Sequence, residues 1–324
     1  MEIGLSNLVS LFFDSLAWDA PLRGGGFSVT CSSTEDFFFV FAMNSPPPSS
    51  LPPWFSQFCA PDADRLSVLA LVLHDSDIPF ELVKTRGFRH LQVRLGRKPN
   101  PQAGEKVLIA HYDRVAASPG ANDNGASVLA LVDYLRRPSP GRRMRVVFTD
   151  GEELTQGMRG DQQGAFALAE SWDRGRALFP VVFDMTGIGD TLVLGHLGQE
   201  LVRQTRVPAG PTALDEYAKL RLRAKRWLAT CGSGDALEVN APFSDDLGFF
   251  LAGIPSVQVS VLPRKQALNY RHTRELPGEF SGNLPGELPP AWKTMHTVDD
   301  RPESLWPSAR ELMAEVLRKL EDFP

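Results

Sequence analysis

Apolar residues recur with two different periods from residue 62 onwards, and these periods predict both helices and strands. A helix is predicted over residues 62–75, with Asp62 as its N-cap, because apolar side chains recur there at helical spacing. Residues 80–95 alternate apolar and polar side chains around Gly87, which predicts a hairpin or two edge strands.

Short continuous apolar runs then alternate with helical segments. The predicted buried strands are 106–110, 144–148, 181–183, 192–194 and 256–262. The predicted helices are 125–137, 161–171, 212–229, 245–252 and a last helix that opens with the capping box Ser308/Glu311. This order predicts an α/β fold with a doubly wound, mostly parallel or mixed central sheet and helices on both faces. In such sheets the functional site lies at the carboxyl ends of the strands.

The regular pattern does not extend over the whole chain. Five prolines lie between positions 46 and 53, and they predict that residues 1–58 form a Pro-rich, poorly ordered or atypical N-terminal extension. Residues 59–324 are expected to form a single domain. A long irregular insertion is predicted near residues 264–294, and such loops in compact domains are usually functional.

Composition narrows the function. With 34 Lys and Arg against 39 Asp and Glu, the net charge is −5, so binding to nucleic acid or to an anionic membrane through bulk electrostatics is not expected. A small or peptidic substrate fits better. The chain has no apolar run long enough for a membrane helix, and no Lys or Arg precedes the short apolar run at the N-terminus, so a cytoplasmic protein is expected. The oligomeric state is left open.

Potential metal ligands follow the predicted strands. They comprise one residue pair after strand 106–110, one acid before helix 125–137, one pair after strand 144–148, one acid after strand 181–183 and one histidine after the insertion. In that order they are His111, Asp113, Asp123, Glu152, Glu153, Asp184 and His296. Imidazole and carboxylate ligands without thiolates suit zinc in a hydrolytic site.

Each of these residues also has an ordinary structural interpretation when taken singly. A carboxylate can cap a turn or lie buried in hydrogen bonds, and His74, His90, His196 and His272 are interpreted as surface or core histidines. Taken together, however, four of the acids would crowd negative charge with no compensating cation: Asp123, Glu152, Glu153 and Asp184. A bound metal ion removes that electrostatic cost.

The motifs at these positions, taken in order, resemble a known family. They are His111-Tyr-Asp113, Gly120-Ala-Asn-Asp-Asn124, Asp150-Gly-Glu-Glu153, Phe183-Asp-Met-Thr-Gly187, Ser244-Asp245 and His296-Thr-Val-Asp-Asp300. The chain resembles the zinc-dependent exopeptidases that include the bacterial leucyl aminopeptidases, aminopeptidase Y and the glutaminyl-peptide cyclotransferases. The likeness covers roughly residues 60–322.

The resemblance implies a dinuclear zinc site. It implies that His111 and Asp184 bind one ion, that Glu153 and His296 bind the other, and that Asp123 bridges them.

The resemblance further implies that Glu152 is the general base and that Asp113 orients the His111 ring. The implied activity is that of a metal-dependent aminopeptidase, which hydrolyses N-terminal peptide bonds of peptides with a free N-terminus through a metal-activated water.

Two alternatives remain beside the aminopeptidase. One is a glutaminyl-peptide cyclotransferase with a single zinc on Asp123, Glu153 and His296, and the long segment 154–164 is similar to that group. Met295, however, stands where cyclotransferases usually have tryptophan. The other alternative is a non-catalytic domain of the same fold.

Overall fold

The computed structural model describes residues 50–96, 104–137, 144–153, 160–173, 178–195, 210–232, 234, 236–274 and 288–323. The expectation for residues 1–49 lies outside this part of the chain. The same holds for residues 275–287 of the predicted insertion. The compact unit that contains the described elements spans Leu51–Pro324.

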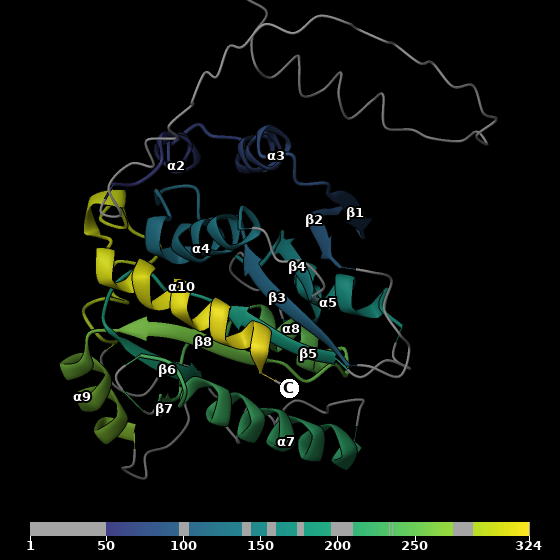
Figure 1. Ribbon diagram of the computed structural model, residues 1–324, viewed down its shortest axis with the longest axis vertical. Helices are drawn as coiled ribbons and strands as arrows, with labels where there is room; N and C mark the ends of the chain where they lie inside the picture. Colours follow the sequence, from purple (N-terminus) through teal and green to yellow (C-terminus); the bar gives the residue numbers. More distant parts are fainter. Residues whose placement is uncertain are drawn as a thin grey trace, which may run out of the picture. The chain divides into compact units, whose positions relative to one another are not determined.

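Most elements follow the order that the hydrophobic pattern predicts (Figure 1), but the pattern did not predict the regular segments 53–58, 237–239 and 264–274. The helices are α2 (Pro53–Phe58), α3 (Arg65–Asp75), α4 (Ala126–Leu135), α5 (Gly164–Glu170), α7 (Gly210–Leu228), α8 (Asp245–Leu251), α9 (Arg264–Arg274) and α10 (Pro307–Asp322). The strands are β1 (Glu81–Thr85), β2 (Phe88–Leu95), β3 (Glu105–His111), β4 (Met144–Thr149), β5 (Leu178–Phe183), β6 (Thr191–Gly195), β7 (Leu237–Val239) and β8 (Val257–Leu262). The described residues also form three short helical turns: Ala121–Gly125, Gly160–Gln162 and Pro302–Ser304.

The strands form one eight-stranded mixed sheet in the order β1-β2-β4-β3-β5-β8-β6-β7. The four central strands β4, β3, β5 and β8 are parallel to one another, whereas β1, β2 and the β6–β8 pair contribute antiparallel neighbours. This confirms the predicted α/β fold class. Because β4, β3 and β5 are adjacent and parallel, their carboxyl ends meet at one edge of the sheet.

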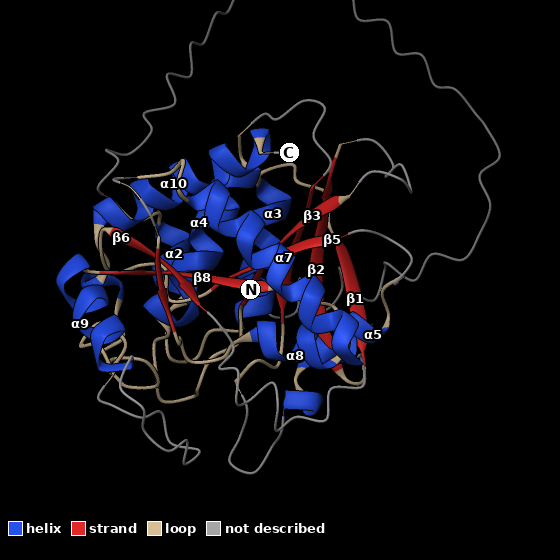
Figure 2. Ribbon diagram, turned by 90° about the horizontal axis from the view of Figure 1, so that it is seen from below, coloured by secondary structure: helices blue, strands red, loops and turns tan. Residues whose placement is uncertain are grey.

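Helices cover both faces of the sheet (Figure 2). On one face α5 and α8 pack against alternate strand residues such as Val107, Ile109 and Val182, all fully buried. On the other face α4 packs against β3, α7 packs against β8, and α10 contacts both of these helices. The central strands are therefore buried on both sides, which is why they read as continuous apolar runs.

Two helix starts differ from the predictions. Helix α3 begins at Arg65, and Asp64 rather than Asp62 is its N-cap, since its side chain accepts the Ser67 backbone N–H. The predicted capping box of the last helix is also wrong. Helix α10 begins one residue before Ser308, with no side-chain cap, and the Ser308 hydroxyl donates to a backbone carbonyl in the loop before β6.

The N-terminal boundary of the compact unit and the start of the insertion also differ from the predictions. The Pro-rich segment ends in helix α2, whose Phe55 and Phe58 are fully buried, so the compact unit begins at residue 51 instead of 59. Proline is tolerated here because Pro53 occupies the first turn of the helix, where its missing N–H costs nothing. The start of the predicted irregular insertion is likewise regular, because residues 264–274 form helix α9.

Candidate metal centre

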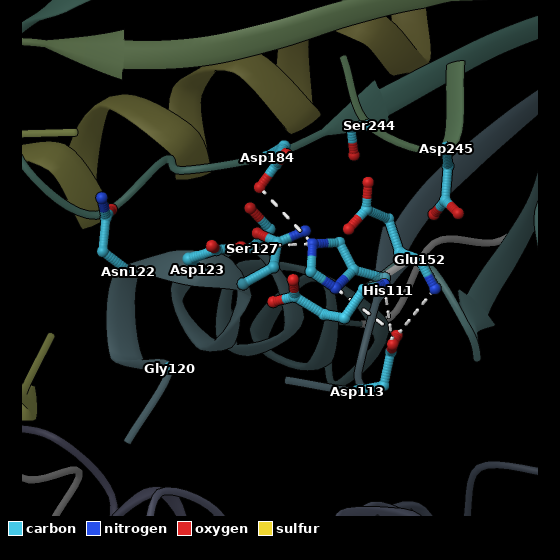
Figure 3. A network of polar contacts seen from close by, with 12 residues as sticks. His111, Asp113, Gly120, Asn122, Asp123, Ser127, Glu152, Asp184, Ser244 and Asp245 are labelled. Carbon is cyan, nitrogen blue, oxygen red and sulfur yellow. Dashed lines mark hydrogen bonds and ion pairs between the residues drawn. The ribbon is translucent and has the colours of Figure 1, made fainter. Parts of the chain in front are cut away.

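The ends of three neighbouring parallel strands bring the predicted site residues together. His111 is the last residue of β3, Asp184 directly follows β5, and Glu152 and Glu153 lie just beyond β4. Figure 3 shows the His111 ring at the centre of this group, with Asp184 on one side and Asp113 on the other. The sheet topology thus places these side chains together although they lie far apart in the sequence.

Asp123 reaches the same edge from the short helical turn Ala121–Gly125. The two asparagines that flank it fix this turn against the chain after β5. Asn122 accepts the Gly187 backbone N–H at 2.8 Å through Oδ1, and Asn124 donates through Nδ2 to the Phe183 carbonyl at 2.8 Å. The asparagines therefore fix the position of Asp123 relative to the end of β5.

Asp300 connects this turn to the loop that carries His296. Its buried carboxylate accepts the backbone N–H of Asn122 at 2.7 Å and that of Asp123 at 3.0 Å. The backbone of His296 has a left-handed conformation, with φ of 62°. Because Asp300 lies four residues after His296, its two hydrogen bonds fix the position of both loops relative to each other.

The two carboxylate oxygens of Asp123 face two different imidazoles. Oδ1 lies 3.4 Å from Nε2 of His111, and Oδ2 lies 3.3 Å from Nε2 of His296. Each imidazole nitrogen has one further carboxylate beside it. Asp184 Oδ1 is 3.6 Å from the His111 nitrogen, and Glu153 Oε2 is 2.9 Å from the His296 nitrogen.

These distances fit zinc ions held between the side chains. Two ligands that bind a tetrahedral zinc ion at about 2.1 Å lie about 3.4 Å from each other. The trio His111, Asp123 and Asp184 and the trio Asp123, Glu153 and His296 each offer ligand atoms within reach of one ion. Both ring nitrogens of His111 and Oδ1 of Asp184 are buried without a hydrogen-bond partner. Because buried polar atoms rarely remain unpaired, Nε2 of His111 and Oδ1 of Asp184, which lie 3.6 Å apart, favour a cation bound beside both of them.

A third group of possible ligands comprises His111, Glu152 and Glu153. It overlaps the first two groups, so the distances alone do not assign Glu152 to the role of base or of ligand. The predicted division of roles among the seven residues therefore stays a prediction, whereas their proximity is a feature of the structure.

The charges of the site influence each other strongly. Burial lowers the pKa of His111, but the neighbouring carboxylates of Asp113, Asp123 and Asp184 outweigh it and raise that pKa well above the usual value. The adjacent carboxylates of Asp123 and Glu153 raise the pKa of His296 to about 10. The acids thus stabilise positive charge at both imidazoles, and a metal cation can take the place of these protons.

Glu152 is a buried acid among other carboxylates. Burial raises the pKa of the Glu152 carboxyl well above its usual value, and Asp184, Glu153 and Asp245 raise it further. A carboxyl with a raised pKa is better matched to accepting a proton near neutral pH than an ordinary glutamate. This environment is compatible with the predicted role of general base.

Asp113 contacts both halves of the site. Its carboxylate accepts the backbone N–H of Glu152 at 3.3 Å and that of Glu153 at 3.0 Å, and it lies 3.6 Å from Nδ1 of His111. Burial raises the pKa of Asp113, but His111 and these N–H groups lower it overall. Asp113 can therefore orient the His111 ring and the backbone that carries both glutamates.

Sequence reasoning assigned no role to several buried residues that support this site. Arg65 donates to the carbonyls of Tyr112 and Gly120, at 3.1 and 2.8 Å, and so connects α3 to the two ligand loops. Asp245 accepts a hydrogen bond from Thr149, and burial raises its pKa to about 7. The motif Ser244-Asp245 was a signal in the sequence for Asp245. No sequence signal pointed to Arg65, because its partners are backbone atoms distant in sequence.

The histidines predicted to be structural lie apart from this cluster where they are described. His90 is fully buried, its Nε2 lies 2.9 Å from the Thr85 hydroxyl, and its Nδ1 accepts the Asp150 backbone N–H at 3.2 Å. Burial lowers the pKa of His90 to about 4, so the ring is neutral and both nitrogens are satisfied. His74 is exposed on α3. His196 and the His272 side chain lie outside the described part of the chain.

Comparison with known structures places the fold. LapA aminopeptidase of Legionella pneumophila is 14% identical with a TM-score of 0.52, over 83% of this chain and 69% of that one. The glutaminyl cyclase of Porphyromonas gingivalis is 16% identical with a TM-score of 0.52, over 86% of this chain and 99% of that one. A zinc aminopeptidase from Bacillus subtilis is 18% identical with a TM-score of 0.46, over 72% of this chain and 49% of that one, so the chain spans about half its length. At these identities the likeness to LapA and to the glutaminyl cyclase establishes the fold alone.

No curated protein gave a significant match. Among the helices that the structure describes, none combines the length and the apolar character needed to cross a bilayer. The sequence profile of peptidase family M28 matches residues 93–320, which is well over half of the sequence and includes all seven predicted site residues. The chain therefore belongs to peptidase family M28.

Proposed function

We propose that this protein is a zinc-dependent aminopeptidase that acts on peptides with a free N-terminus. His111, Asp184 and Asp123 would hold one ion, and Glu153, His296 and Asp123 would hold a second. The observation that carries this proposal is the position of Asp123. Its two oxygens face two different imidazoles at 3.4 and 3.3 Å, as a carboxylate shared by two cations must.

Zinc bound at these residues supplies Lewis acidity, which polarises a scissile carbonyl and makes water nucleophilic near neutral pH. The protein supplies the base and its orientation. Glu152, buried beside the ligands, accepts a proton from the attacking water and returns it to the leaving amine. Asp113 keeps the His111 ring and the Glu152 backbone in place through the contacts described above.

A glutaminyl-peptide cyclotransferase is the second candidate. The long segment 154–164 after Glu153 favours it, and glutaminyl cyclases share the fold. In that case one zinc on Asp123, Glu153 and His296 suffices, and His111 with Asp184 would not need a metal. A non-catalytic domain is less well supported, because every ligand position and the base are occupied by residues able to act.

Mass spectrometry of a short peptide with an N-terminal glutamine separates these candidates. The peptide is incubated with zinc-loaded protein, and a leucine-headed peptide of the same length serves as the control. An aminopeptidase shortens the peptides by their first residue. A cyclotransferase leaves the length unchanged and removes ammonia from the glutamine peptide only. If neither peptide changes, both proposed activities are refuted.

A further inference from the structure

Gln163 is a buried polar residue that is not one of the seven predicted site residues. It lies directly before helix α5 and is 1% exposed. Its amide nitrogen Nε2 lies 3.2 Å from Oε1 of Glu152 and 3.4 Å from the Glu152 backbone oxygen. Both of these oxygens belong to the proposed general base.

The orientation of the Gln163 amide follows from its surroundings. A backbone carbonyl accepts hydrogen bonds and never donates them, so the group that faces the Glu152 carbonyl must be the NH2 of Gln163. The same NH2 then points at the Glu152 carboxylate. Oε1 of Gln163 is buried and has no hydrogen-bond partner among the described residues. Burial of such an atom costs free energy, which an apolar side chain at this position would avoid.

The backbone on both sides of this contact is also fixed. Gly164 donates its N–H to the Gly151 carbonyl at 3.0 Å, and a Cβ on Gly164 would lie 1.7 Å from the Asp150 carbonyl oxygen. The turn that carries Glu152 therefore lies directly against the start of α5. Gln163 can act on the Glu152 side chain from a rigid support, because the helix start and the turn are in backbone contact.

We propose that Gln163 is a positioning residue for Glu152: its amide holds Oε1 of the carboxylate and leaves Oε2 as the oxygen that accepts the proton. Figure 3 shows the Glu152 carboxylate beside the His111 ring, on the side of Ser244 and Asp245. Without Gln163 the carboxylate has no described side-chain hydrogen bond to select one rotamer. This inference rests on the proposed function, in which Glu152 is the base.

The test is the substitution Gln163→Met, which keeps the length of the side chain and removes the donor. Gln162→Met, one residue earlier on the exposed side of the turn, is the matched control. We expect Gln163→Met to lower kcat about 10- to 100-fold, as expected for a displaced base, with KM and zinc content close to wild type. The control variant should retain wild-type kcat. Gln163→Asn, whose shorter amide cannot reach Glu152, is a second variant with the same expected loss.

A double-mutant cycle distinguishes positioning from general stability. If Gln163 acts through Glu152, adding Gln163→Met to a Glu152→Gln protein should change the residual turnover less than about twofold. A second loss as large as in the wild-type background would overturn the inference, because the effect would then not depend on the carboxylate.

A crystal structure of the Gln163→Met protein gives a readout that needs no activity. We expect the Glu152 carboxylate to move or to occupy more than one rotamer, whereas wild-type protein crystallised alongside has one. An unchanged single rotamer refutes the positioning role even if the protein is inactive on every peptide. If the wild-type protein is inactive but the Glu152 carboxylate moves in the variant, the proposed function is refuted and the positioning role is not.

Discussion

Substitution of Glu152 by glutamine tests the central assignment of the proposed mechanism. Glutamine has nearly the same shape as glutamate, so the change leaves no cavity at this buried position. The new amide oxygen can still accept the hydrogen bond from Gln163. The substitution therefore removes the ability to accept a proton and little else.

The expected size of the effect follows from the role of Glu152. General base catalysis contributes roughly 10²- to 10⁴-fold to a rate, which corresponds to about 3–5 kcal/mol of transition-state stabilisation. We expect kcat to fall by this factor. Metal content should stay at the wild-type value, because the two trios that share Asp123 do not include Glu152. The substitution also removes a negative charge that Asp184 and Glu153 repel, so the chelator-treated variant should be at least as stable as wild type near neutral pH.

The assay combines peptide turnover, followed by mass spectrometry, with zinc quantification of the same dialysed sample. Turnover within about tenfold of wild type would refute the assignment of Glu152 as the base. Loss of one zinc equivalent would refute it in a different way. It would show that Glu152 is a ligand, as the third group with His111 and Glu153 allows. Thermal unfolding of the variant serves as the control for folding.

Three further predictions concern the metal, its pH dependence and the domain boundary. His296→Ala should lose zinc and turnover together, measured by metal analysis after dialysis, whereas His74→Ala on the exposed face of α3 should keep both. Acidic neighbours raise the pKa of His111 and that of His296, the latter to about 10, so zinc must displace protons from these rings. Zinc affinity, measured by competition with a chelator, should therefore rise between pH 6 and 8, by about tenfold per pH unit for each proton released. The stability of chelator-treated protein changes with pH in the opposite direction, because the contribution of these raised histidine pKa values is complete below about pH 6.5 and is lost as pH rises towards 10. The difference in Tm between zinc-loaded and chelator-treated protein should therefore widen as pH rises. A constant difference would contradict this linkage. Phe55→Ala should lower the free energy of unfolding by about 3–5 kcal/mol in denaturant titrations, because Phe55 is fully buried; a change below about 1 kcal/mol would show that α2 is not part of the folded unit.

The order of helices and strands was predictable because the central strands and their covering helices carry their own periodicity. A strand buried on both faces must be apolar throughout, and a helix on the sheet must repeat its apolar side chains at helical spacing. The predicted strand 106–110 and helix 125–137 therefore correspond closely to β3 and α4. Helix α9 was not predicted, because its sequence is strongly polar.

The helix starts show why boundaries are harder to predict. Asp62 and Asp64 are chemically equal candidates for the N-cap of α3, and only the path of the preceding chain decides between them. Ser308 likewise fits a capping box in sequence. In the structure its hydroxyl instead bonds to a carbonyl of a loop more than 100 residues earlier, an alternative that no local pattern reveals.

The site, too, was only partly predictable from the sequence. The sequence by itself determined which side chains follow the strands, because polar residues after an apolar run are visible in the chain, and parallel strands must end at one edge. Only the tertiary structure decided that each oxygen of Asp123 faces its own imidazole, that Asp300 connects two loops, and that Gln163 contacts Glu152. These contacts join backbone and side-chain atoms from separate elements, so they depend on how the elements pack and leave no periodic signal in the sequence.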